Sequence, residues 1–194
     1  MKKTLLILLF FTINGYSQIY TYDKAEIHFR NGEIEEGYVK ILNFKEIKFR
    51  TSLDDKPVKF NYKKINKIIK REDGKDVEYQ YKIVKAKRKN YPRLMKLVTS
   101  GKVSLYTTEH KDIVGQNSPL MLEYDGLSYY MVRDNSHIAE YVGAKTIAIG
   151  RKSVKKGLLT YFKDCPKLIK KIENKEFGKK DIIKITEYYN THCE

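Results

Sequence analysis

The sequence predicts an α+β protein whose first two-thirds are mostly antiparallel β, a small barrel-like part followed by a β-meander, before a helical C-terminal segment. Apolar residues alternate with polar ones in short runs up to about residue 132, which is the period of half-buried strands. After residue 153 they recur every three or four positions, the period of helices. The expected regions are a signal peptide at 1–17, a barrel-like region at 18–72, a meander at 73–134 and a helical region with a disulfide at 135–194.

The first residues have the layout of a cleavable secretory signal. Lys2 and Lys3 precede an apolar run at residues 4–13, and small residues then favour cleavage between Ser17 and Gln18. The run is about half the length of about 20 residues that a membrane-spanning helix needs. We therefore expect an exported chain, periplasmic or secreted, with no stable membrane insertion after cleavage.

Five short strands are expected in the region 18–72. Ala25, Ile27 and Phe29 alternate with polar residues, and Asn31-Gly32 follows as a two-residue hairpin signal. The remaining strands are expected at 34–42, with a bend or bulge at Gly37, and at 47–49, 58–62 and 65–69. Strands this short do not bury a core as an open flat sheet, so we expect them to curl into a small barrel.

The stretch AEIHFRNGEIEEGYVKI within this region resembles the SH3-like and Sm-like small barrels. In those folds a strand, a turn glycine and a second strand with an internal glycine follow one another in this order. The resemblance concerns topology and covers about a quarter of the chain. It implies a barrel that binds peptides, nucleic acids or partner subunits, and it leaves the function of this chain open.

A second β region is expected between residues 73 and 134. Its strands are expected at 77–84, 94–98, 103–107, 121–124 and 127–132. Residues 109–119 are expected to form a polar loop, and Asp125-Gly126 is a hairpin signal between the last two strands.

Three helices are expected at the C-terminal end. Asp164-Cys165-Pro166 separates the first from the second, because proline suits the first position of a helix. Gly178 ends the second helix and Asp181 caps the third. The expected inward faces are Val154, Leu158, Tyr161 and Phe162, then Leu168, Ile169 and Ile172, and then Ile182, Ile185, Tyr189 and Cys193.

The two cysteines, Cys165 and Cys193, are expected to form a disulfide. An even cysteine count in an exported protein favours this pairing. The bond would close a loop of about 29 residues, which corresponds to about 3.6 kcal/mol in the chain-entropy model. The alternative is a pair of buried thiols. A metal site is disfavoured because no His or Cys lies at ligand spacing from either cysteine.

The C-terminal stretch resembles a group of exported bacterial proteins of unknown function. They share a YFxDCPxL segment and a YNxxC ending, which residues 161–168 and 189–193 match. The resemblance implies export and a common disulfide. It carries no known activity.

The chain is strongly basic, with a formal net charge of +15, or +13 without Lys2 and Lys3. Such an excess can serve to bind an anionic polymer of the cell envelope. It can also be compositional, since 32 lysines stand beside only seven arginines. Phosphate and base recognition favour arginine, and export argues against nucleic acid as a partner.

Catalytic signatures are absent from the sequence. The four histidines are scattered, and Asp134, Ser136 and His137 are too close together in the chain for a catalytic triad. Glu35 and Glu36 are adjacent in a strand and therefore point to opposite faces. No catalytic or metal-binding residue and no cofactor is expected.

The expected function is that of an exported, non-catalytic binding or structural protein of the periplasm or cell envelope. Its expected partner is an envelope polymer or another protein. The alternatives are an envelope-directed hydrolase whose site cannot be read from the sequence, and a basic clamp for acidic glycan or lipopolysaccharide.

Overall fold

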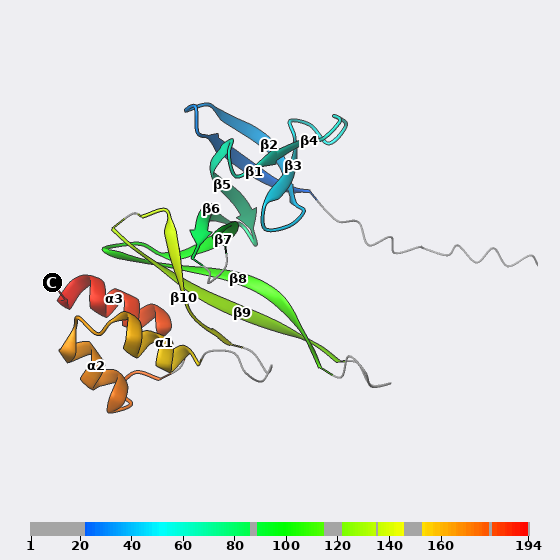
Figure 1. The fold of residues 1–194 in the computed structure, drawn as a ribbon. Helices are drawn as coiled ribbons and strands as arrows, with labels where there is room; N and C mark the ends of the chain where they lie inside the picture. Colours follow the sequence, from blue (N-terminus) through cyan, green and yellow to red (C-terminus); the bar gives the residue numbers. More distant parts are fainter. Residues whose placement is uncertain are drawn as a thin grey trace, which may run out of the picture.

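The computed structural model describes residues 22–85, 89–114, 122–134, 136–145, 153–178 and 180–193. These residues form one ten-stranded sheet and three helices, with the helices at one end of the molecule and β1 to β4 at the other (Figure 1). The predicted signal peptide at 1–17 and the predicted cleavage site between Ser17 and Gln18 lie outside the described residues.

The strands are β1 (Asp23–Phe29), β2 (Ile34–Ile41), β3 (Glu46–Arg50), β4 (Val58–Asn61), β5 (Ile65–Glu72), β6 (Lys75–Val84), β7 (Tyr91–Thr99), β8 (Val103–Val114), β9 (Leu122–Arg133) and β10 (Ile138–Lys145). The helices are α1 (Val154–Tyr161), α2 (Pro166–Glu173) and α3 (Ile182–His192). The strand order is β10-β9-β8-β7-β6-β5-β1-β2-β3-β4. The α+β class is therefore confirmed.

The sheet is mostly but not purely antiparallel, because its last strand returns to its sixth. β10 pairs antiparallel with β9 and also parallel with β6, through Ile138 opposite Ile83 and Ala139 opposite Val84. Strands β6 to β10 therefore close into a ring. The cluster associated with this ring consists of Val84, Met95, Tyr106, Tyr130, Val132 and Ala139.

The first five strands share a separate core but do not close on themselves. In the described residues β4 pairs only with β3, and β5 pairs with β1 and β6. The second edge of β5 is thus occupied by β6, and among the described strands a hydrogen-bonded ring is present only in β6 to β10. The buried cluster of this part is Ala25, Ile27, Phe29, Val39, Ile47, Phe49, Ile65 and Ile68, with Tyr81 of β6 and Leu94 of β7.

The predicted bulge at Gly37 is absent, because β2 keeps its register with β1 through this residue. The irregularity lies instead in β1, between His28 and Phe29 where they face β5. A side chain at Gly37 would place its Cβ 2.4 Å from the carbonyl oxygen of Arg50 and 2.7 Å from the ring of Phe49. The glycine therefore permits close packing of β2 against β3.

Two further loop predictions were wrong in the second β region. Asp125 and Gly126 lie inside β9, opposite Lys111 and His110 of β8. Residues 109–114, which were expected in a polar loop, continue β8 and pair with β9. The long pairing of β8 with β9 overrides the local turn preference.

The start of the helical region was also predicted too early. Residues 138–145, inside the stretch 135–194, form β10, and the first helix begins at Val154. The pairing of β10 with β9 and β6 explains this strand.

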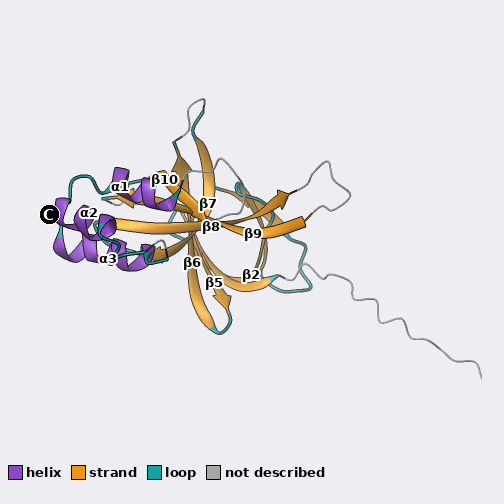
Figure 2. Cartoon of the chain, turned by 90° about the horizontal axis from the view of Figure 1, so that it is seen from below, coloured by secondary structure: helices purple, strands orange, loops and turns teal. Residues whose placement is uncertain are grey.

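The three helices gather at one end of the sheet (Figures 1 and 2), where α1 packs on β10, α3 packs on β7 and β8, and α2 contacts α1 and α3. All four residues of the predicted face of α1 are buried, and α2 buries Leu168 and Ile172. α2 ends at Glu173, earlier than the predicted Gly178. Asp181 stands at the N-cap of α3, but its carboxylate accepts a hydrogen bond from the backbone N–H of Gly178 instead of capping the helix.

Candidate functional site

A cleft of about 350 Å³ opens where the first core meets the ring. Its apolar side chains come from the end of β2, the β2–β3 turn and β7, and its polar ones from β5 to β8. Its size falls within the lower range of small-molecule sites, which are concave and combine apolar walls with a few polar groups. The lining residues are Ile41, Phe44, Lys70, Glu72, Tyr79, Leu94, Lys96, Thr107, Thr108 and Glu109.

The Glu72 carboxylate organises the polar floor of this cleft. It accepts hydrogen bonds from the Tyr79 hydroxyl at 2.6 Å and from Lys96 Nζ at 2.9 Å. Lys70 Nζ lies 3.0 Å from the same carboxylate and 2.9 Å from Asp23. Residues from β1, β5, β6 and β7 thus meet in one charged network.

This network keeps Glu72 ionised. Burial acts to raise its pKa, but the hydrogen bonds from Tyr79, Lys96 and Lys70 outweigh burial and lower the pKa from 4.5 to about 2. Burial and the bond to Glu72 raise the pKa of Tyr79. A carboxylate with so low a pKa is a poor general base at neutral pH. The floor therefore suits the binding of a polar group better than proton transfer.

The apolar rim is held in place and still exposed. The backbone N–H of Leu94 donates to the carbonyl of Phe44 at 3.0 Å, which ties the β2–β3 turn to β7. The guanidinium of Arg93 lies over the Phe44 ring, 3.9 Å from its centre. Phe44 nevertheless remains 46% exposed and Ile41 38% exposed. An exposed aromatic ring above a polar floor is an arrangement that can contact both sides of an amphipathic ligand.

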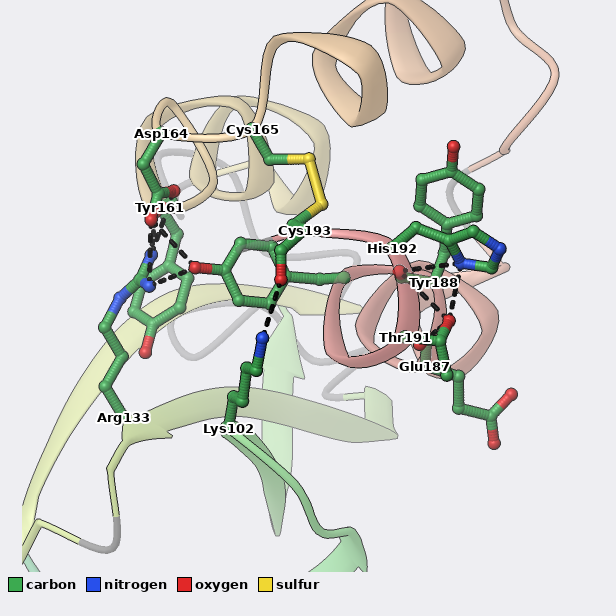
Figure 3. The surroundings of a disulfide bond; sticks show 11 residues. Lys102, Arg133, Tyr161, Asp164, Cys165, Glu187, Tyr188, Thr191, His192 and Cys193 are labelled. Atoms are coloured by element: carbon green, nitrogen blue, oxygen red, sulfur yellow. Dashed lines mark hydrogen bonds and ion pairs between the residues drawn. A yellow bond between two sulfur atoms is a disulfide. The ribbon is translucent and has the colours of Figure 1, made fainter.

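A second cluster surrounds the disulfide between Cys165 and Cys193, whose Cα atoms lie 5.8 Å apart (Figure 3). The pairing predicted from the sequence is present. The bond joins the residue before α2 to the residue after α3. Lys102 donates to the carbonyl oxygen of Cys193 at 3.0 Å, which fastens the end of α3 to the start of β8.

Arg133, at the end of β9, completes this cluster. Its guanidinium donates to the Tyr189 hydroxyl at 2.6 Å and to the carbonyl of Tyr161 at 2.8 Å, and it lies 3.0 Å from the Asp164 carboxylate. Tyr189 in turn donates to Asp164 at 2.8 Å. These contacts join the sheet to α1, to the connection between α1 and α2, and to α3, which is a structural role.

Asn190 makes a further pair of bonds between α3 and the sheet. Its side chain donates to the carbonyl of Val103 at 2.9 Å and accepts from the N–H of Val103 at 2.8 Å. The matched segments YFxDCPxL and YNxxC thus consist largely of residues that hold the helices to the sheet. Sequence reasoning missed Arg133, Lys102 and Val103 because they precede these segments by many residues.

The residue types first considered for catalysis are not brought together. Ser136 Oγ accepts from the N–H of Ile138, and Asp134 adopts a positive φ of 49° in the preceding turn. His137 is exposed. Glu35 pairs with Ile27, and Glu36 pairs with Glu26. Within the described residues no group of three or more His, Cys, Asp or Glu side chains could hold a metal ion.

No family model, no curated protein and no solved structure matches this chain. Among the described residues no helix is long and apolar enough to cross a membrane. The geometry of the described residues is therefore the basis for proposing a function.

Proposed function

We propose that the protein is an exported, non-catalytic binding protein of the bacterial envelope and that the cleft above Glu72 is its binding site. The ligand is amphipathic and hydroxylated, as a sugar unit of an envelope glycan is. Its apolar face packs on Phe44, and its hydroxyls exchange hydrogen bonds with Lys96 and Glu109. The predicted signal peptide and the disulfide support an address outside the cytoplasm.

This proposal depends on one combination of features: the polar groups around Glu72 at the floor of the cleft are already hydrogen-bonded, while Phe44 and Ile41 at its rim are exposed. Glu72 receives three donors, so the floor is already organised before a ligand arrives. Lys96 uses one of its ammonium hydrogens for Glu72, and its side chain is 37% exposed. Its other hydrogens are therefore able to reach a ligand. A preorganised site loses less free energy on binding than one that must order its side chains.

Titration calorimetry tests this proposal. The probe is a set of neutral oligosaccharides released from the host's own envelope, titrated into oxidised protein consisting of residues 18–194. We expect saturable binding that Phe44→Ala weakens about tenfold, equivalent to about 1.4 kcal/mol. The matched control is Leu53→Ala, since Leu53 is 50% exposed and does not line the cleft.

Phe44→Ala is expected to keep the fold, because the bond from Leu94 to residue 44 uses the backbone carbonyl. Equal affinities for the two variants would place the binding elsewhere on the molecule. Turnover of the oligosaccharides by the wild-type protein would contradict the non-catalytic role and favour the hydrolase alternative.

A further inference from the structure

Strands β2, β3 and β4 lie at the end of the sheet away from the helices (Figure 1), and their register places a row of lysines across them. Lys40 of β2 is directly opposite Lys48 of β3, and Lys48 is directly opposite Lys59 of β4. Residues directly opposite each other in antiparallel strands point to the same face. The three ammonium groups therefore share one face of the sheet, and we refer to Lys40, Lys48 and Lys59 as the lysine row.

The next row of the same face is also basic. Lys24 of β1 is opposite Tyr38, and Tyr38 is opposite Arg50. The guanidinium of Arg50 lies over the ring of Tyr22, 3.9 Å from its centre. Five cations and Tyr38 thus lie in two neighbouring rows, in which no acidic residue stands, and Tyr22 adds a second ring beside Arg50. The other face of these strands carries the buried core residues Val39, Ile47 and Phe49.

Acidic residues flank this band, but two of the three lysines in the row stand without an acidic partner among the described residues. In the described part of the chain, neither Lys48 nor Lys59 forms an ion pair with a carboxylate. Asp55, in the β3–β4 connection, accepts hydrogen bonds from the Thr51 hydroxyl at 2.5 Å and the Ser52 N–H at 2.8 Å.

Such a row lowers the stability of the fold, and binding of an anionic partner would offset this cost. Like charges directly opposite each other destabilise a sheet. Neighbouring strands lie about 4.8 Å apart, so the row extends over about 10 Å. This is close to the Debye length of about 8 Å at about 0.15 M salt, so the three charges act together on one anionic partner.

We infer that the lysine row and the adjacent Lys24, Tyr38 and Arg50 form a docking surface for an acidic polysaccharide. Lysine carries a compact charge on a flexible stem, which suits an extended polymer of repeating anionic groups. Tyrosine rings among the cations offer flat apolar area to sugar rings. This surface is on the opposite face of the β2–β3 hairpin from the core side chains and is independent of the cleft proposed above.

The probe is polygalacturonate, a polysaccharide with one carboxylate on each sugar, and neutral dextran is the reference polymer. The variants are Lys40→Gln, Lys48→Gln and Lys59→Gln combined, and a control that combines Lys156→Gln, Lys167→Gln and Lys170→Gln. Both triple variants lower the net charge by three. The control lysines are exposed residues of α1 and α2.

We expect polygalacturonate to bind saturably at about 0.15 M salt and to lose about tenfold in affinity with the lysine-row variant. The control variant is expected to change the affinity less than about twofold, because its lysines are elsewhere on the surface. Polyphosphate in a second titration distinguishes a requirement for sugar rings from a general response to anionic polymers. Phe44→Ala is expected to leave polygalacturonate binding unchanged.

Equal losses in the two triple variants would show that the net charge alone attracts the polymer and would overturn the inference. Equal binding of dextran, or tighter binding of polyphosphate than of polygalacturonate, would also overturn it. A variant in which all three lysines become arginine keeps the positive charge at these positions. If it retains binding, the loss in the glutamine variant comes from the missing charges and not from a disturbed fold. Far-ultraviolet circular dichroism of each variant monitors the fold.

Discussion

Cations are used in opposite ways at the two ends of this molecule. Arg133, beside the helices, meets a carboxylate and a tyrosine hydroxyl, and it joins the sheet to the helices. Lys48, at the other end, stands between two other lysines and has no carboxylate partner among the described residues. A positively charged side chain therefore stabilises the fold in one region, where it meets a carboxylate, and destabilises it in the other, where it faces further lysines. Position in the fold, more than composition, separates structural cations from those left for a partner.

The disulfide gives the largest way to test this contrast. Replacing Cys165 and Cys193 with serine removes the covalent link between α2 and α3. We expect a loss of about 3.6 kcal/mol in the free energy of unfolding, the chain-entropy value for this loop. Hydrogen exchange is expected to accelerate in residues 153–193 and to change little in β1 to β4. Uniform acceleration throughout the chain would instead mean that both ends unfold as one cooperative unit.

Gly157→Ala tests how closely the helices are bound to the ring. A Cβ at this position would lie 1.4 Å from the carbonyl oxygen of Val142 in β10, so α1 must move away from the strand. We expect a destabilisation of about 3 kcal/mol, measured by denaturant unfolding. Gly74→Ala is the control, since no atom lies within 4 Å of a Cβ there, although its φ of +77° adds its own strain. A smaller effect at Gly157 than at Gly74 would contradict this close packing.

Glu72→Gln tests how much the ionised Glu72 carboxylate, which lies between the two ends, contributes to stability. Because the folded pKa of about 2 is below the ordinary 4.5, the stabilisation by Glu72 is fully present above about pH 4.5. It is lost as the pH falls through about 2. At neutral pH we expect the variant to lose about 2 kcal/mol, after allowance for partial exposure of the carboxylate. Urea unfolding between pH 2 and pH 7 should show a smaller pH dependence for the variant than for the wild type, and parallel curves would contradict the role of Glu72.

Lys48→Glu gives the smallest and most diagnostic effect. A glutamate between Lys40 and Lys59 replaces two repulsive pairs with two attractive ones. We expect unfolding to become less favourable by about 0.5 kcal/mol, while polygalacturonate binding is lost. Thermal unfolding and the polymer titration measure the two effects on the same sample. If stability falls with Lys48→Glu, the row is not a site of repulsion and the contrast with Arg133 fails.

Local patterns in the sequence were sufficient for most of the elements. Strands β1 to β3 were predictable because the buried residues of each lie on one face, which imposes the period of two. The helical faces were predictable for the equivalent reason. Asp125-Gly126 misled because a dipeptide carries a turn preference but no information about the strand that will pair with it. The return of β10 to β6 depends on contacts between residues 55 positions apart, such as Ile138 and Ile83.

The cleft could not be predicted because its members come from separate strands. Glu72 meets Tyr79 seven residues away and Lys96 24 residues away, and neither spacing belongs to a known motif. The lysine row was hidden for another reason. Its three lysines look like ordinary members of a basic composition until the strand register sets them opposite one another. The disulfide was predictable because only two cysteines were available.

Strand β6 has a consequence for any attempt to divide the protein. Its Tyr81 belongs to the core of β1 to β5, while its Val84 belongs to the cluster of the ring. A cut in the turn after Glu72 would deprive the first five strands of Tyr81 and of Leu94, both buried in their core. Limited proteolysis should therefore yield no folded fragment that ends near residue 72, and crystallographers should express the two halves together.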